Sequence, residues 1–180
     1  MRVVAGKYGG RTLKSLNGRT TRPTSDKIKA AVFNMLGGFF DGGRVLDLYA
    51  GSGALAIEAV SRGCEAATLV EKDSGAQKVI SANLEMTKES EKFQLLKMPA
   101  QQAMVRMEKP FDLIFLDPPY ALQEMAADIE MLQTRNLLTA QAKIICETEK
   151  STELPEVIRD LEIWKQKIYG ITKITIYTKM

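Results

Sequence analysis

Apolar and polar positions along the chain change period in a regular order, from the alternation typical of strands to the spacing typical of helices. From residue 44 onward, short apolar runs alternate with longer segments that have apolar residues three or four positions apart. The expected strands are 45–49, 67–71, 93–97, 111–117 and 143–147, and the expected helices are 54–62, 74–87, 100–107 and 122–133. Such alternation predicts an α/β fold with a parallel sheet covered by helices on both faces.

The C-terminal end departs from this order. Segments 161–168 and 171–179 alternate apolar and polar residues around Tyr169-Gly170, which predicts a hairpin. A hairpin appended to a parallel sheet makes the last strand antiparallel to its neighbours. We therefore expect a Rossmann-like, mostly parallel sheet of seven strands with an antiparallel last strand.

The N-terminal end is also distinct. Strand-like pieces at 2–5 and 11–15 predict a small hairpin, and apolar residues at helical spacing predict a helix over 28–36 that stops at a glycine pair. We interpret residues 1–40 as a hairpin and helix extension packed on a core domain formed by residues 41–180.

The positive charge of the chain is concentrated in this extension. The whole chain has a net charge of +3, but residues 1–29 contain eight basic residues and one acidic residue. Clustered Lys and Arg side chains displace counterions from a phosphate backbone, which favours contact with nucleic acid. The candidate nucleic-acid-binding residues are Arg2, Lys7, Arg11, Lys14, Arg19 and Arg22. The alternative is a solvated basic loop that binds nothing.

The composition excludes several classes of site. With 180 residues, 45% of them hydrophobic, the chain can bury one core. It has no histidine, which removes the commonest general base, the usual hydrolase triads and most zinc sites. Cys64 and Cys146 have no metal-ligand spacing, so we expect buried, reduced thiols and no metal. Transfer of a methyl group from a sulfonium fits these limits, because such a donor is already activated.

The start of the chain gives an expectation about location. Residues 1–7 reach glycine and charge too early for a secretory signal, and no apolar run extends over about eighteen residues. We therefore expect a cytoplasmic protein without a membrane partner.

A glycine-rich loop at 47–53 leaves the expected strand 45–49 and enters a helix. Gly51 and Gly53 let the backbone turn sharply and approach a ligand closely, with helix N–H groups facing it. The stretch also satisfies the dinucleotide fingerprint G-x-G-x-x-A, and Glu71 follows Gly51 at the spacing of a ribose-binding acid. Asp47 favours S-adenosylmethionine over a dinucleotide, because a carboxylate there can serve the charged methionyl portion and has no evident use beside a pyrophosphate.

Each acidic residue has a simpler explanation. Asp47 can be a buried acid that caps the amides of the turn, and Glu71 can be a surface carboxylate. After the third expected strand, where an acid would hold the adenine amine, the chain offers only Gln101, whose amide can reach the adenine edge by hydrogen bonding.

The tetrapeptide at 117–120, DPPY, follows the apolar run 111–116. An exocyclic amine on a nucleobase is a poor nucleophile until acceptors on its N–H bonds push it towards tetrahedral geometry. The Asp117 carboxylate and the Pro118 carbonyl can be those acceptors, Pro118 and Pro119 stiffen the turn, and Tyr120 can stack on a flipped base. This pattern predicts a methyltransferase acting on a nucleobase amine. The alternative is a Pro-Pro turn with a capping aspartate and a surface tyrosine.

Together these residues resemble the class I S-adenosylmethionine-dependent methyltransferases that carry an Asp/Asn-Pro-Pro-Tyr/Phe motif. Segments 2–11, 21–36 and 169–174 narrow the resemblance to the bacterial 16S ribosomal RNA guanine-(N2)-methyltransferase family known as RsmD. The likeness extends essentially from end to end. It is specific, because the Arg-Pro-Thr segment at 22–24 and the basic hairpin are not general methyltransferase features.

The resemblance implies methylation of the exocyclic N2 of a guanine in 16S ribosomal RNA, within a small-subunit assembly particle, by a chain that we expect to be monomeric. By position, Asp117, Pro118, Pro119 and Tyr120 hold the guanine, whereas Asp47, Gly51, Gly53 and Glu71 hold the cofactor. Arg22 and Thr24 lie beside the methionyl end or the target base, and the alternative for Thr24 is helix capping alone. Family members tend to have an acid after the third strand, so Pro99 and Gln101 are a departure.

Two other functions remain open from the sequence. The amine-binding motif also occurs in enzymes that methylate DNA adenine, DNA cytosine or protein glutamine, although 180 residues leave little room for a DNA-reading domain. The other possibility is a non-catalytic RNA-binding assembly factor that retains the cofactor fold, against which the intact Asp117 and glycine loop argue.

Overall fold

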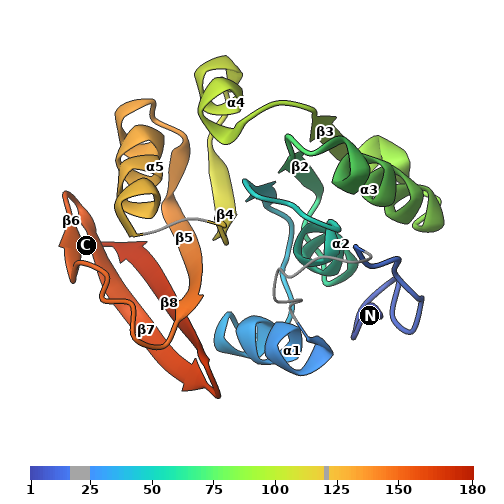
Figure 1. The fold of residues 1–180 in the computed structure, drawn as a ribbon, viewed down its shortest axis with the longest axis horizontal. Coiled ribbons are helices and arrows are strands. Elements are labelled where there is room, and N and C mark those ends of the chain that lie inside the picture. The colour runs from blue at the N-terminus through green and yellow to red at the C-terminus, as the bar shows by residue number, and fades with distance from the viewer. Residues whose placement is uncertain (17–24, 120–121) are drawn as a thin grey trace.

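The computed structural model describes residues 1–16, 25–119 and 122–180. Within these ranges, eight strands form one sheet in the order β3-β2-β1-β4-β5-β8-β7-β6 (Figure 1). Strands β1 to β5 are parallel to one another, whereas β8 lies antiparallel between β5 and β7. The strands are β1 (Arg44–Asp47), β2 (Ala66–Val70), β3 (Phe93–Leu96), β4 (Phe111–Leu116), β5 (Leu138–Glu149), β6 (Val157–Ile158), β7 (Leu161–Tyr169) and β8 (Thr172–Lys179).

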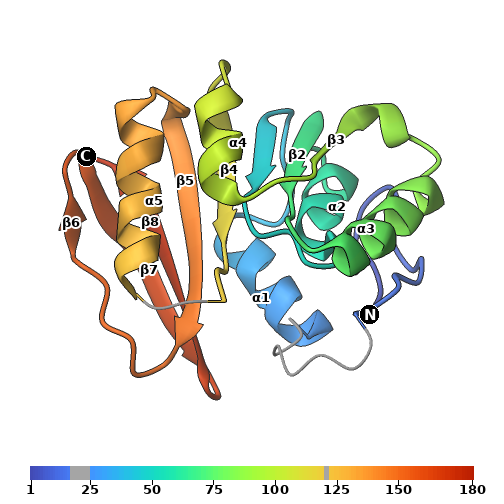
Figure 2. The same ribbon diagram turned by 45° about the horizontal axis from the view of Figure 1, so that its top comes forward.

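Helices cover both faces of this sheet. They are α1 (Asp26–Met35), α2 (Ala54–Ser61), α3 (Ser74–Met86), α4 (Ala100–Arg106) and α5 (Leu122–Thr134), with a short 3-10 helix, η1 (Ser90–Lys92), before β3. Helices α4 and α5 lie on one face, and α1, α2 and α3 lie on the other (Figure 2). Within β4, Phe115 packs against Phe33 of α1 with ring centroids 5.7 Å apart, and Ile114 joins the core under α5. Burial on both faces explains why this strand is a continuous apolar run.

The predicted parallel sheet and its antiparallel last strand are confirmed. The sheet has one strand more than the seven expected, because the two-residue β6 pairs with the edge of β7 and is too short to give an alternating pattern. Strand β5 is longer than the expected 143–147. The register between β4 and β5 shifts between Phe111 and Leu113, so that Leu138 also pairs with Phe111.

The N-terminal hairpin is reduced to a single antiparallel bridge between Arg2 and Thr12. The backbone N–H groups of Val4 and Ala5 donate to the carboxylate of Glu58 in α2, at 2.9 and 3.1 Å, instead of to a neighbouring strand. Gly6 (φ +87°) approaches α2 so closely that a Cβ there would lie 2.0 Å from the carbonyl oxygen of a residue in that helix. The segment therefore packs on α2, while the division into an extension and a core domain stays a prediction.

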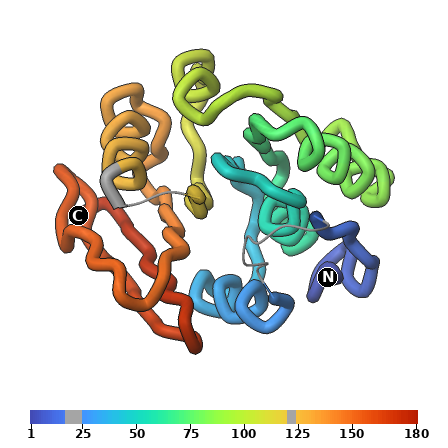
Figure 3. The backbone as a smooth tube through the Cα atoms, viewed as in Figure 1, coloured from blue at the N-terminus to red at the C-terminus, as the bar shows by residue number. Residues whose placement is uncertain are grey.

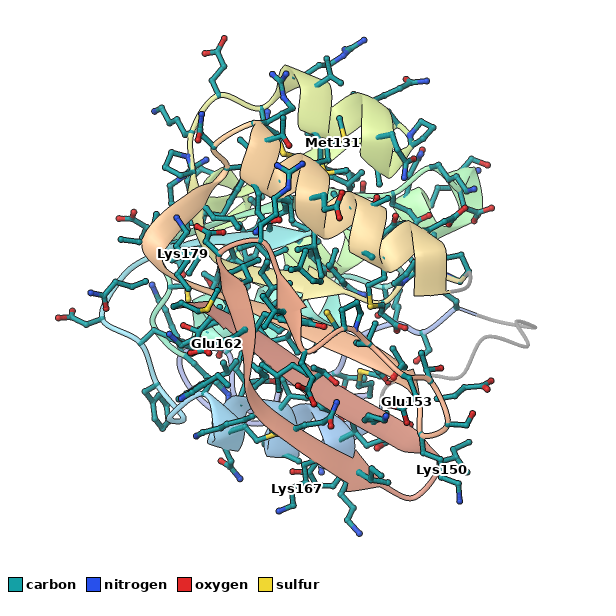
Figure 4. All side chains as sticks on the ribbon, turned by 90° about the vertical axis from the view of Figure 1, so that its left-hand side faces the viewer. Met131, Lys150, Glu153, Glu162, Lys167 and Lys179 are labelled. Atoms are coloured by element: carbon teal, nitrogen blue, oxygen red, sulfur yellow. The ribbon has the colours of Figure 1, made fainter. Side chains whose placement is uncertain are left out.

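The C-terminal hairpin forms one end of the molecule, away from the N-terminal segment (Figure 3). Figure 4 looks onto this end, where Glu162 and Lys167 extend from β7 and are exposed. In the ranges that the structure describes, no helix is long and apolar enough to cross a membrane.

Candidate active site

The carboxyl ends of β1, β2 and β4 meet at one edge of the sheet, where a parallel α/β fold places its ligands. Asp47 is the last residue of β1, Glu71 follows β2 directly and Asp117 follows β4 directly. The structure thus brings the predicted cofactor acids and the predicted amine-binding acid to the same edge.

The glycine loop connects β1 to α2. Gly53 (φ +83°) caps α2 in the left-handed region, and a Cβ there would lie 3.1 Å from a side-chain carbon of Leu69. Gly51 (φ +59°) has the opposite surroundings, since a Cβ there would meet nothing within 4 Å. One glycine therefore serves close packing against β2, while the other leaves the backbone open to a ligand at the start of α2.

Asp47 has the features of a ligand-binding acid. It is only 3% exposed, and its Oδ2 accepts no hydrogen bond from the residues that the structure describes. Burial raises the pKa of Asp47 to about 7; the backbone N–H of Ala56 opposes this rise, and the charge of Glu71 adds to it. A buried carboxylate oxygen without a donor is costly, and a cationic group supplies both the missing donor and the missing charge. The site therefore fits a ligand that carries an ammonium group.

Glu71 lies between the glycine loop and α3. Its Oε1 accepts a hydrogen bond from the Gly51 backbone N–H at 2.9 Å, and its Oε2 accepts one from the Asp73 N–H at 3.0 Å. These bonds fix the carboxylate beside the open backbone at Gly51. A hydrogen bond thus connects the predicted cofactor acid Glu71 to the glycine loop.

Gln101, the predicted adenine contact, belongs to a cluster that sequence reasoning missed. Its side-chain amide donates to Asp128 of α5 at 3.1 Å, and the hydroxyl of Tyr49 in the glycine loop donates to the same carboxylate. Asp128 is 2% exposed, and burial raises its pKa. To keep its bond to Asp128, Gln101 can offer an adenine amine only its amide carbonyl. The available signal was an acid at position 128, within the apolar face of α5 beside Ile129.

The motif after β4 borders a recess in the surface. Asp117 is half-buried, Pro118 is buried and Pro119 is exposed, whereas Tyr120 lies outside the described residues. The recess is lined by Val32, Leu55, Phe115, Leu116, Asp117, Ile145, Glu147 and Ile174. Its walls thus come from α1, α2, β4, β5 and β8. Glu147 was not among the predicted residues, although it follows an apolar run in β5 much as Asp117 follows one in β4.

The predicted RNA-binding residues have different surroundings. Lys7 forms an ion pair with Glu89, with Nζ and Oε1 2.7 Å apart, and Arg11 donates to the backbone carbonyls of Met86 and Thr87 at 3.2 and 3.1 Å. Arg2 and Lys14 are exposed, whereas Arg19, Arg22 and Thr24 lie outside the described residues. Two of the six predicted side chains therefore interact with α3 and the loop that follows it.

The cysteines do not supply a nucleophile. Cys64 and Cys146 are buried free thiols, and burial raises the pKa of both, that of Cys64 to about 12. Neither forms a thiolate readily at neutral pH. Among the described residues, no three His, Cys, Asp or Glu side chains are grouped so that they could hold a metal ion.

Similarity to known proteins extends over nearly the whole chain. Residues 1–178 match the family model described as conserved hypothetical protein 95. The chain is 42% identical to "Putative rRNA methyltransferase YlbH" of Bacillus subtilis, over 99% of each chain. It is 33% identical to ribosomal RNA small subunit methyltransferase D of Haemophilus influenzae, over 98% of this chain and 93% of that one.

A solved structure has the same fold. "Putative methyltransferase yhhF from Escherichia coli" superposes with a TM-score of 0.87 and 28% sequence identity, over 99% of this chain and 97% of that one. The matched model covers nearly the whole chain, and the YlbH and Haemophilus relatives align along its full length. The chain therefore belongs to the RsmD family of methyltransferases, the family that its motifs resemble.

Proposed function

We propose that this protein transfers a methyl group from S-adenosylmethionine to the exocyclic N2 of a guanine in 16S ribosomal RNA during small-subunit assembly. The observation that carries the proposal is the pairing of two groups at one sheet edge. Asp47 has a buried carboxylate oxygen without a donor among the described residues, and Asp117 begins an amine-binding motif after β4, the strand that pairs with β1 in the sheet. The first suits a cationic donor, and the second suits an amine acceptor.

The cofactor site would use the residues around the glycine loop. Asp47 would accept the methionyl ammonium, Gly51 and Gly53 would bring backbone N–H groups close to the ligand, and Glu71 would accept the ribose hydroxyls. Gln101 would contact the adenine amine, while Arg22 and Thr24 would lie beside the methionyl end or the target base. When bound, S-adenosylmethionine supplies a methyl group on a positively charged sulfur.

The chain itself then has to orient and activate the amine. The Asp117 carboxylate and the Pro118 carbonyl would each accept a hydrogen bond from one N–H group of the N2 amine. These two hydrogen bonds would raise the electron density of the N2 lone pair and align it with the methyl carbon. Bound S-adenosylmethionine would supply the methyl group that N2 takes up, and Asp117 would accept the proton that N2 then loses and pass it to water. Tyr120 would stack on the flipped base.

The substrate part of the proposal is supported by relatives and by charge. YlbH and the Haemophilus protein carry names that state ribosomal RNA as their substrate. The basic residues of the first thirty positions suit a phosphate backbone. We accordingly propose a cytoplasmic monomer that acts on small-subunit particles, with residues 1–40 contacting RNA and residues 41–180 performing catalysis.

A digest of labelled nucleosides tests the proposal. With S-adenosylmethionine labelled in its methyl group and small-subunit ribosomal RNA or particles, we expect N2-methylguanosine from the wild type. Asp117→Ala should abolish the label while cofactor binding persists. Label recovered as N6-methyladenosine from DNA would contradict the substrate assignment. Cofactor binding without transfer to any RNA would instead favour an assembly factor without catalytic activity.

A further inference from the structure

Basic and aromatic side chains form a strip along strand β7, in the C-terminal hairpin. From Ile163 to Tyr169 this strand contains two lysines and no acid. Trp164 is the only tryptophan of the chain, and it is 43% exposed, although tryptophan is highly buried on average. We call this surface the β7 strip and define it by Lys143 of β5 together with Trp164, Lys165, Lys167 and Tyr169 of β7.

The lysines of the β7 strip lie over its aromatic rings. The Nζ atoms of Lys143 and Lys165 are 5.0 and 4.2 Å from the centroid of the Trp164 ring. The Nζ atom of Lys167 is 5.4 Å from the centroid of the Tyr169 ring. A cation over an aromatic face is attracted by the ring while its N–H groups stay available to other acceptors. The rings therefore restrict three ammonium groups to one surface before any ligand binds.

These three positive charges are not paired with acids. No acid among the described residues forms an ion pair with any of the three lysines. Lys143 donates to the hydroxyl of Thr178 at 3.1 Å, and Lys165 donates to the backbone carbonyl of Met35 at 2.9 Å, so both have neutral partners. Clustered ammonium groups without acids attract a polyanion, because each can replace a counterion on a phosphate.

The β7 strip lies on the same face of the sheet as the candidate active site. Lys167 pairs with Ile174 of β8, which pairs with Glu147 of β5, and Asp117 follows β4 at the register of Glu147. Residues in one row across a sheet extend to the same face, and neighbouring strands are about 4.8 Å apart, which puts Lys167 about 14 Å from Asp117. Figure 4 shows Lys167 at the outer side of β7. A nucleic-acid strand with a base at Asp117 can therefore extend along the strip.

We propose that the β7 strip is a further RNA-binding surface, which holds the single-stranded RNA next to the target base. The lysines provide point charges for its phosphates, and the exposed part of the Trp164 ring can stack on a base. A protein with an acidic surface would match the charges but has no base to place on the ring. The inference rests on the proposed RNA substrate, and it adds a contact in the C-terminal hairpin, away from the basic N-terminal segment (Figure 3).

Trp164 itself provides the readout, because all tryptophan fluorescence of the chain comes from this residue. Titration of the wild type with small-subunit ribosomal RNA, or with a short single-stranded RNA of mixed sequence, should quench that fluorescence. Added salt should restore it, since phosphate contacts weaken as salt rises. Polyglutamate at the same concentration of charges should quench it much less. Equal quenching by polyglutamate would overturn RNA as the occupant and favour an acidic protein.

Variants of Lys167 test the charge without removing a hydrogen bond. Lys167→Gln should reduce the slope of log K against log salt by about 0.7 to 0.9, which weakens binding about fourfold at about 0.15 M salt. Methylation should show this loss in KM, with kcat and the affinity for S-adenosylmethionine unchanged, because the contact is equal in the ground and transition states. Lys167→Arg keeps the charge and should keep the wild-type slope. Lys109→Gln, at an exposed lysine before β4 on the opposite edge of the sheet, is the matched control.

Each outcome decides the proposal. Quenching by RNA, together with a smaller salt slope for Lys167→Gln than for Lys109→Gln, supports it. Absence of quenching in the wild type, or equal slopes for the two variants, overturns it and leaves the lysines as covers of the aromatic rings, with Lys165 at the C-terminal end of α1. A wild type that is quenched by RNA but methylates none would instead remove the proposed function and leave the RNA-binding surface.

Discussion

Asp47 and Glu58 are both almost fully buried acids, but they differ in the hydrogen-bond and ion-pair partners of their carboxylates. Glu58 lies 2.7 Å from Arg62 Nε and 3.2 Å from Lys29 Nζ, and it also accepts the N–H groups of Val4 and Ala5. Asp47 Oδ2 accepts no hydrogen bond from any residue that the structure describes. A buried charge that the fold satisfies holds elements together, whereas one that it leaves unsatisfied is suited to a ligand.

The Glu58 cluster should give the largest effect on stability. Glu58→Gln would leave the cations of Lys29 and Arg62 buried without their acid, and we expect a loss of about 5 kcal/mol in the free energy of unfolding. Urea denaturation of the wild type and the variant measures the loss. Glu65→Gln, at an exposed acid just beyond α2, should change stability by no more than about 0.5 kcal/mol. A loss for Glu58→Gln that is equally small would show that the cluster does not fasten the N-terminal segment.

Replacement of Asp47 should stabilise the protein near neutral pH, whereas replacement of Glu58 should destabilise it. An acid whose pKa rises from 3.8 unfolded to about 7 folded contributes stability below pH 3.8, and that contribution is lost as the pH rises to about 7. The loss corresponds to at most about 4 kcal/mol. Asp47→Asn cannot ionise, so its unfolding free energy should vary less over this window and exceed that of the wild type near neutral pH.

Ligand binding completes the test of Asp47. S-adenosylmethionine at one hundred times its Kd should stabilise the wild type by about 2.7 kcal/mol, and Asp47→Asn should lose most of that gain. Asp41→Asn, at an exposed acid before β1, is the control and should keep both the pH dependence and the ligand effect. Equal stabilisation of the Asp47→Asn variant by the cofactor would refute a role for Asp47 in binding it.

Asp47 and Glu58 also differ in how far the sequence could predict their roles. Asp47, Glu71 and Asp117 could be predicted to lie at one edge of the sheet because each ends or follows a strand, and parallel sheets place their ligands at that edge. Gly53 was found because a sharp turn into a helix requires a positive φ. These features depend on local order along the chain, which the apolar pattern encodes directly.

Other features depend on contacts between distant segments. Asp128 acquires its role because Tyr49 and Gln101 converge on it from two other elements, and the position of Glu58 matters only because residues 4 and 5 pack on α2. Glu147 was treated as an ordinary strand end, since its register with Asp117 is a property of the pairing of β4 with β5. Periodicity identifies elements, but it does not state which of them pack together.

The basic residues proposed to bind RNA also differ in whether the protein already provides a partner for their charge, and we expect a smaller effect from this difference. Lys7 is hydrogen-bonded to Glu89, which lowers the pKa of Glu89 to about 2, whereas Lys14 is exposed. A phosphate must displace Glu89 to reach Lys7, whereas no acid among the described residues forms an ion pair with Lys14. Lys14→Gln should therefore reduce the slope of log K against log salt by about 0.7 to 0.9, and Lys7→Gln should reduce it less. Equilibrium binding to ribosomal RNA across a salt series measures both slopes. Equal reductions would mean that Glu89 does not restrain Lys7, and two unchanged slopes would leave this segment a solvated basic loop.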